Sequence, residues 1–146
     1  MKKLENVMIN IKTVQYDSSS KEQDVIELRT EGKYYKKNNA DYLIYEETEL
    51  SGLSGTTTKI KIKGDQVELR RIGEHESAMS FEKDKRFQSV MSTPVGNIPL
   101  EIMTNNIRYD ILPDPLSLKL EFEYSIALKG LFQGKNLISI EATQIK

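Results

Sequence analysis

The chain of 146 residues contains no cysteine, no tryptophan and one histidine, His75. Without cysteine it can form no disulfide, no thiolate metal site and no thiol-based catalytic centre. A single histidine cannot complete a typical zinc ligand set in the absence of a second histidine or a cysteine. We therefore expect no metal and no cofactor. An enzyme would need a convergent set of titratable groups in one cleft, which the sequence does not suggest, so we expect that the protein is not an enzyme.

Strong charge of either sign and long apolar runs are also missing. The 21 Lys and Arg residues balance 22 Asp and Glu, so the formal net charge is -1. A near-neutral chain has no long-range attraction to polyanions, which argues against nucleic-acid binding. No segment reaches the roughly 18 apolar residues of a membrane span, and Glu5, Asn6, Asn10 and Lys12 interrupt the apolar run that a signal peptide requires. The sequence predicts a cytoplasmic protein without a membrane partner.

Alternation of apolar and polar residues dominates the chain and is typical of strands with one buried face. The clearest example is residues 116–128, where every second residue is apolar. These apolar residues are Leu116, Leu118, Leu120, Phe122, Tyr124, Ile126 and Leu128. Shorter segments with the same pattern occur at 7–12, 26–31, 59–63 and 100–104. Each is predicted to be a β-strand.

Short polar turns separate these segments. Gly64 and Asp65 lie between two alternating runs and predict a tight hairpin. Residues 133–136 predict the turn that returns the long strand into the last one. We count eight to ten strands, no convincing helix and no linker, so residues 1–146 are predicted to form a single all-β domain. Consecutive hairpins favour an antiparallel up-and-down β-barrel, because closure removes exposed strand edges; a sandwich is the alternative.

An ordered set of short segments resembles the YwiB-like family of small bacterial proteins. The set comprises residues 27–37 (ELRTEGKYYKK), 45–47 (YEE), 58–60 (TKI), 71–73 (RIG) and 79–81 (MSF). The similarity covers nearly the whole chain and is densest from 27 to 73. The resemblance implies a single calycin-like (lipocalin-like) β-barrel in the cytoplasm. It implies no established activity and brings no catalytic or ligand-binding residues.

Arg71 is the most informative polar residue. It has the same parity as Val67 and Leu69, so it points inward if they face the core. Glu46 and Glu47 are placed on a neighbouring strand, and one of them must share that inward face. A buried guanidinium must be paired. Arg71 either has a structural role at the barrel mouth, bonded to carbonyl or carboxylate oxygens, or anchors an anionic head group, which arginine recognises well.

Tyrosines are concentrated on two adjacent predicted strands, at positions 34, 35, 42 and 45. Such rings either pack in the core and across strands, or form the wall of a ligand pocket. The candidate ligand-binding residues are Arg71, Glu46, Glu47, Tyr35, Tyr45 and Tyr124, the last of which lies on the apolar face of the long strand.

Three other groups of residues receive a structural interpretation. His75 lies between two glutamates and is interpreted as a solvated turn residue rather than a general base. Glu46 and Glu47 cannot flank one glycosidic bond, because adjacent strand residues point to opposite faces. One strand face carries Lys59, Lys61 and Lys63. These lysines are expected to keep the protein soluble and to block pairing at a strand edge, with a weak RNA or acidic-partner surface as the alternative.

Two functional hypotheses follow. In the first, the protein is a non-catalytic binding module that holds a small, partly apolar ligand in the barrel mouth near Arg71 and the tyrosines, with an anionic ligand as one option. In the second, the barrel is solid and its outer surface binds a partner protein, a homodimer being the commonest assembly. An internal cavity discriminates between them.

Overall fold

The computed structural model describes residues 4–47, 54–74, 76–93 and 96–145. Strands account for most of these residues, as the alternating sequence predicts. They are β1 (Glu5–Asp17), β2 (Gln23–Lys37), β3 (Ala40–Glu46), β4 (Thr56–Lys63), β5 (Gln66–Gly73), β6 (Ser77–Glu82), β7 (Arg86–Thr93), β8 (Gly96–Pro113), β9 (Leu116–Leu128) and β10 (Phe132–Gln144). Within this part of the chain no helix is long and apolar enough to cross a membrane.

The strands form one antiparallel sheet that curls into a nearly closed barrel. Their order is β6-β5-β4-β3-β2-β1-β10-β9-β8-β7, so hydrogen-bonded neighbours are consecutive in sequence except where the first strand meets the last. The β1–β10 ladder is long and runs from Val7↔Gln144 to Asp17↔Gly134. The all-β up-and-down barrel predicted from the sequence is confirmed.

The sheet is interrupted between β6 and β7, which form its two edges. One parallel bridge, Lys83↔Thr104, links the segment after β6 to β8. The backbone N–H of Asp84 donates to the carbonyl of Thr104 at 2.9 Å. Closure at this seam therefore depends on a few contacts rather than on a continuous ladder.

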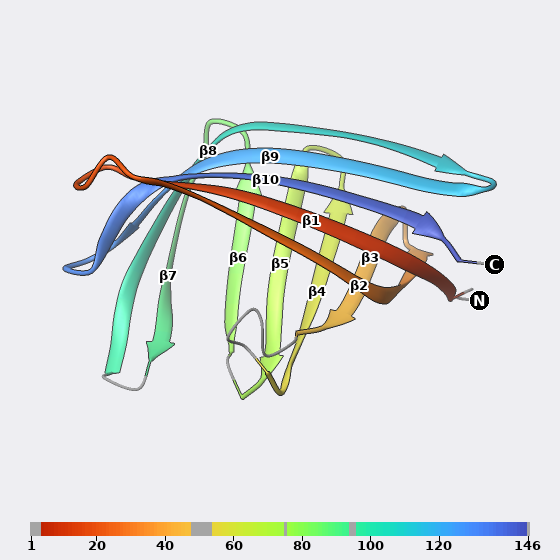
Figure 1. The fold of residues 1–146 in the computed structure, drawn as a ribbon, viewed down its shortest axis with the longest axis horizontal. Coiled ribbons are helices and arrows are strands. Elements are labelled where there is room, and N and C mark those ends of the chain that lie inside the picture. Colours follow the sequence, from red (N-terminus) through yellow and green to blue (C-terminus); the bar gives the residue numbers. More distant parts are fainter. Residues whose placement is uncertain (1–3, 48–53, 75, 94–95, 146) are drawn as a thin grey trace.

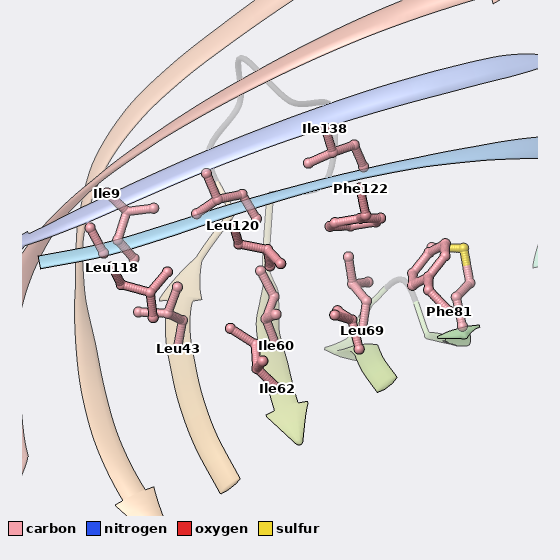
Figure 2. Close-up of a cluster of buried hydrophobic side chains, with 14 of the residues drawn as sticks. Ile9, Leu43, Ile60, Ile62, Leu69, Phe81, Leu118, Leu120, Phe122 and Ile138 are labelled. Carbon is pink, nitrogen blue, oxygen red and sulfur yellow. The ribbon is translucent and has the colours of Figure 1, made fainter. Parts of the chain in front are cut away.

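Two layers of the sheet face each other across the core. In Figure 1, β1, β8, β9 and β10 run together across the picture, and β3 to β6 cross below them. Figure 2 shows side chains from the two layers meeting. Ile9, Leu118, Leu120, Phe122 and Ile138 lie opposite Leu43, Ile60, Ile62, Leu69 and Phe81 in this buried cluster. Burial of the apolar face of each strand is the main source of stability in such a barrel.

The predicted hairpin at 63–66 is confirmed, because β4 ends at Lys63 and β5 begins at Gln66. The predicted turn at 133–136 is wrong. The chain turns at 129–131, where Gly130 has a φ of 80°, and Gly134 lies within β10. A Cβ atom on Gly134 would lie 2.0 Å from the carbonyl oxygen of Tyr16. This glycine permits the close approach of β10 to β1 and does not form a turn.

Candidate ligand-binding site

A cavity of about 230 Å³ lies inside the barrel, between the layer formed by β1, β2 and β10 and the layer formed by β3, β4 and β5. Apolar side chains make up most of its wall, among them Ile11, Leu28, Ile60, Leu69, Ile138 and Ile140. Ile26 and Glu27 also border it; Ile26 is 53% exposed and Glu27 is exposed, so the cavity opens at this edge of β2. The volume is somewhat below the roughly 300–1,000 Å³ of most ligand pockets, which restricts the site to a small ligand.

One end of the cavity is polar. Tyr45, Thr58, Arg71 and Ser77 are consecutive partners across β3, β4, β5 and β6, so their side chains lie in one row on the inner face. Tyr45 and Arg71 line the cavity. Arg71 is partly buried, as its parity with Val67 and Leu69 predicts.

Glu47 joins this row directly after β3. Its backbone N–H donates to the carbonyl of Thr56 at 2.8 Å, which continues the strand pattern by one residue. Its side chain lines the cavity and is only 8% exposed. The inward parity of Leu43 and Tyr45 extends to Glu47, because alternate residues of an extended chain share a face.

Three buried polar atoms of this cluster lack a hydrogen-bond partner of regular geometry. They are Oε2 of Glu47, Oγ1 of Thr58 and Nε of Arg71. Buried polar groups are almost always hydrogen-bonded, and an unsatisfied one costs roughly 1–3 kcal/mol. Two of the three atoms belong to residues that line the cavity, Glu47 and Arg71.

Burial and charge shape the protonation of the cluster. Burial raises the pKa of the Glu47 carboxyl, while the Arg71 charge and the nearby hydroxyls of Tyr45 and Thr58 act in the opposite direction. Burial also raises the pKa of the Tyr45 phenol, and the Glu47 carboxyl raises it further. Tyr45 therefore stays a neutral phenol, and the Glu47 carboxyl has a pKa above its ordinary value.

Three of the predicted candidates do not belong to the cavity wall, namely Glu46, Tyr35 and Tyr124. Glu46 is exposed, because it is adjacent to Glu47 in an extended chain and points to the opposite face. Tyr35 also lies on the outer face, where its ring stacks on Tyr42 with centroids 4.6 Å apart. The predicted tyrosine cluster is thus divided between two faces, with Tyr34 and Tyr45 inside the barrel.

Tyr124 lies inside the barrel but in the packed core rather than at the cavity. Its ring contacts Phe81 with centroids 4.6 Å apart, and its hydroxyl accepts a hydrogen bond from Nδ2 of Asn136 at 3.0 Å. Burial raises the pKa of Tyr124, and the Arg71 charge lowers it. Tyr124 is therefore a core residue that does not line the cavity. The Oδ1 atom of Asn136 and Oγ1 of Thr104 are further buried atoms without a partner.

Sequence reasoning missed most of the cavity wall. Several wall residues come from strands that are far from Arg71 in sequence, and the curling of the sheet brings them to the same cavity. They include Thr13, Ile26, Leu28 and Ile138. Their alternation shows that they face inward, but it does not show which strand lies opposite. No local pattern in the sequence could have found them.

The expectation that Lys59 and Lys61 block edge pairing is wrong, because their strand β4 pairs with both β3 and β5 and is not an edge of the sheet. The ammonium groups of Lys59 and Lys61 lie 5.0 and 6.0 Å from the centre of the Tyr42 ring on the outer face, away from the cavity. His75 lies outside the described residues. Among the described residues, no group of three or more His, Asp or Glu side chains is arranged to hold a metal ion.

Comparisons with known proteins agree with the architecture. Residues 9–140 match the family model described as "Domain of unknown function (DUF1934)". The crystal structure of the ywiB protein from Bacillus subtilis matches with a TM-score of 0.84 and 23% sequence identity, covering 98% of this chain and 94% of that chain. No curated protein matches the sequence significantly. The match to the ywiB protein shows a shared fold, and the family model extends over most of the sequence. The chain therefore belongs to the DUF1934 family, the YwiB-like family of small bacterial β-barrel proteins.

Proposed function

We propose that this protein is a non-catalytic binding module that holds one small, partly apolar ligand inside the barrel. The observation that carries the proposal is the cavity of about 230 Å³, with apolar walls and a polar end formed by Arg71, Glu47 and Tyr45. The apolar part of the ligand would contact the isoleucine and leucine side chains. Its head group, anionic in solution, would lie at Arg71, because a guanidinium is suited to bind carboxylate or phosphate oxygens.

Binding rather than catalysis is proposed because of the groups that face the cavity. Among the described residues, the ionisable groups that line it are two carboxyls, one guanidinium and one phenol. This set can orient and hold a head group by hydrogen bonds, as the few polar groups of small-molecule sites usually do. We propose a lipocalin-like mode of binding, in which the barrel interior encloses the ligand. We also propose that the protein acts in the cytoplasm, without nucleic acid or membrane as partner.

The alternative is a protein-interaction module that acts through its outer surface, with a second copy of the chain as partner. The edge strand β7, which pairs only with β8 in the described sheet, favours this alternative, and Val90 on it is 56% exposed. The cavity favours the first proposal, since a module that acts only from outside needs no polar groups left without partners inside.

Native mass spectrometry of protein purified from its own host tests both proposals at once. The binding module predicts a small non-covalent adduct, and saturable binding when the purified protein is titrated with fatty acids or other lipophilic anions. A bare monomer that binds none of these compounds would overturn it. A dimer without any adduct or ligand binding would instead support the interaction module.

A further inference from the structure

Glu47 places a buried carboxyl group in the cavity wall. A carboxyl group that is more than nine-tenths buried normally has its oxygens hydrogen-bonded. Here Oε2 has no partner of regular geometry although the side chain borders the cavity. Nε of Arg71, on the opposite side of the same polar row, is an unpartnered donor. A molecule that fills this space therefore lies beside a buried donor and a buried carboxyl oxygen, neither of which has a hydrogen-bond partner of regular geometry.

The charges limit what the head group can be. Arg71 supplies one positive charge inside the cavity, and Glu47 already faces it with a carboxyl group. A ligand that brings a second negative charge leaves one buried anion uncompensated, which is strongly unfavourable. The excess is removed if one of the two acidic groups takes up a proton. Two carboxyl groups forced together in this way share a single proton, because both cannot stay ionised at close range.

We propose that the head group of the ligand is a single carboxyl group, and that this group and Glu47 hold one proton between them beside the Arg71 guanidinium. This inference rests on the binding function proposed above and specifies its ligand class as monocarboxylic acids with a short apolar tail. In the complex, one O–H bond forms from a solvent proton, and no other bond forms or breaks. The resulting group of two carboxyls, one proton and one guanidinium is electrically neutral. Its proton satisfies the free oxygen of Glu47, and the ligand oxygen accepts from Arg71.

The surroundings of Glu47 are compatible with this arrangement. From β3 it faces the Tyr45 phenol, and from β4 the Thr58 hydroxyl. From β5 it faces the Arg71 guanidinium, and Glu27 of β2 borders the same cavity at its exposed edge. The sides formed by β1 and β10 contribute Thr13 and isoleucines, which carry no charge. Arg71 is thus the positive charge that faces Glu47 in the cavity wall.

A shared proton makes binding depend on pH in a definite direction. Burial already raises the pKa of Glu47 in the free protein. Below that pKa, Glu47 is protonated and an ionised ligand enters without net proton uptake, so affinity is constant. Above it, each binding event must take up one proton, and affinity falls about tenfold per pH unit.

Isothermal titration calorimetry with octanoic acid and methyl octanoate tests the inference. The ester has the same chain and can accept from Arg71, but it has no proton to share with Glu47. Titrations of the acid from about pH 5.5 to about pH 8.5 give the pH profile, and buffers of different ionisation enthalpy count the protons taken up. We expect one proton per octanoate bound at the alkaline end, and at least tenfold weaker binding of the ester at the acid end.

Glu47→Gln and Glu46→Gln form a matched pair of variants, since both replace a carboxyl by an amide at neighbouring positions. The amide of Glu47→Gln donates to an ionised ligand, so binding should lose its proton uptake and its pH dependence. Glu46→Gln changes only the outer face and should behave as the unchanged protein. Circular dichroism shows whether each variant is folded. If Glu47→Gln does not fold, the number of protons that the unchanged protein takes up per octanoate tests the shared proton: one supports it, and none would overturn it.

The possible results distinguish a failure of the shared proton from a failure of the binding function. Octanoate binding with the same pH profile in Glu47→Gln, or ester binding as tight as acid binding, would overturn the shared proton but leave the binding function intact. If neither compound binds the folded protein at any pH, the proposed function fails and this inference fails with it. Proton uptake that disappears only in Glu47→Gln supports both.

Discussion

Replacing Arg71 by methionine separates a ligand-binding role from a structural one. The methionine side chain retains the apolar stem of arginine, so packing along the inner face of β5 is largely preserved. The change removes the guanidinium, including the buried Nε that has no hydrogen-bond partner. It also removes the positive charge that faces Glu47.

The two effects on stability oppose each other. Removing an unsatisfied buried donor stabilises the free protein by about 1–3 kcal/mol. Losing the attraction between Arg71 and Glu47 costs about 1–3 kcal/mol at the effective dielectric constant of a partly exposed site, and Glu47 reduces this cost by taking up a proton. We therefore expect Arg71→Met to change the free energy of unfolding by no more than about 2 kcal/mol in either direction.

Ligand binding should respond much more strongly. A hydrogen bond to a charged group contributes about 1.5–3 kcal/mol, so octanoate affinity should fall roughly 10–150-fold. Urea denaturation followed by circular dichroism gives the stability, and calorimetric titration gives the affinity. A loss of more than about 3 kcal/mol in stability with unchanged affinity would show that Arg71 is a structural residue and would refute the reasoning.

Two further predictions concern the fold and the cavity carboxyl. Because burial raises the pKa of Glu47 above its ordinary value of 4.5, the folded protein holds this proton more tightly than the unfolded chain. The free energy of unfolding should therefore fall as pH rises from that value through the raised pKa, by up to about 1.4 kcal/mol per pH unit. Glu47→Gln should remove this decline in urea titrations at several pH values, and an unchanged decline would contradict the assignment. Gly134→Ala should destabilise the protein by more than about 3 kcal/mol, because the added Cβ would lie 2.0 Å from a carbonyl oxygen of β1. Gly64→Ala, at a turn with open space around the glycine, should cost about 1 kcal/mol; equal losses in the two variants would contradict the close approach of β10 to β1.

The strand content of the fold could be predicted because the alternating pattern is unusually regular. The long strand expected at residues 116–128 coincides with β9. The turn after it was misplaced because Gly134 has two possible uses, a turn or a close contact between strands, and the sequence does not distinguish them. The interruption between β6 and β7 could not be predicted from the sequence either, because the position of the sheet edges depends on how the whole sheet closes.

For the candidate site, the sequence predicts which face of a strand each side chain points to, but not which strands lie opposite each other. Counting along β5 placed Arg71 on the inner face, where the structure has it. The alternation that begins at Leu43 and Tyr45 continues to Glu47, so the sequence favours Glu47 over Glu46 as the inward carboxyl group. Tyr34 and Tyr35 are neighbours on one strand, so their side chains point to opposite faces of the sheet, and only Tyr34 points into the barrel. The opposite wall of the cavity required the three-dimensional pairing of β1, β2 and β10.

A crystal structure of the protein with octanoic acid tests the central claim most directly. The account predicts density for the ligand in the cavity between the two layers, with its tail against Ile60 and Ile138. Its carboxyl group should lie within hydrogen-bonding distance of both Arg71 and Glu47. A crystal grown under saturating ligand in which side chains fill this space, or in which the acid lies elsewhere on the surface, would contradict the claim.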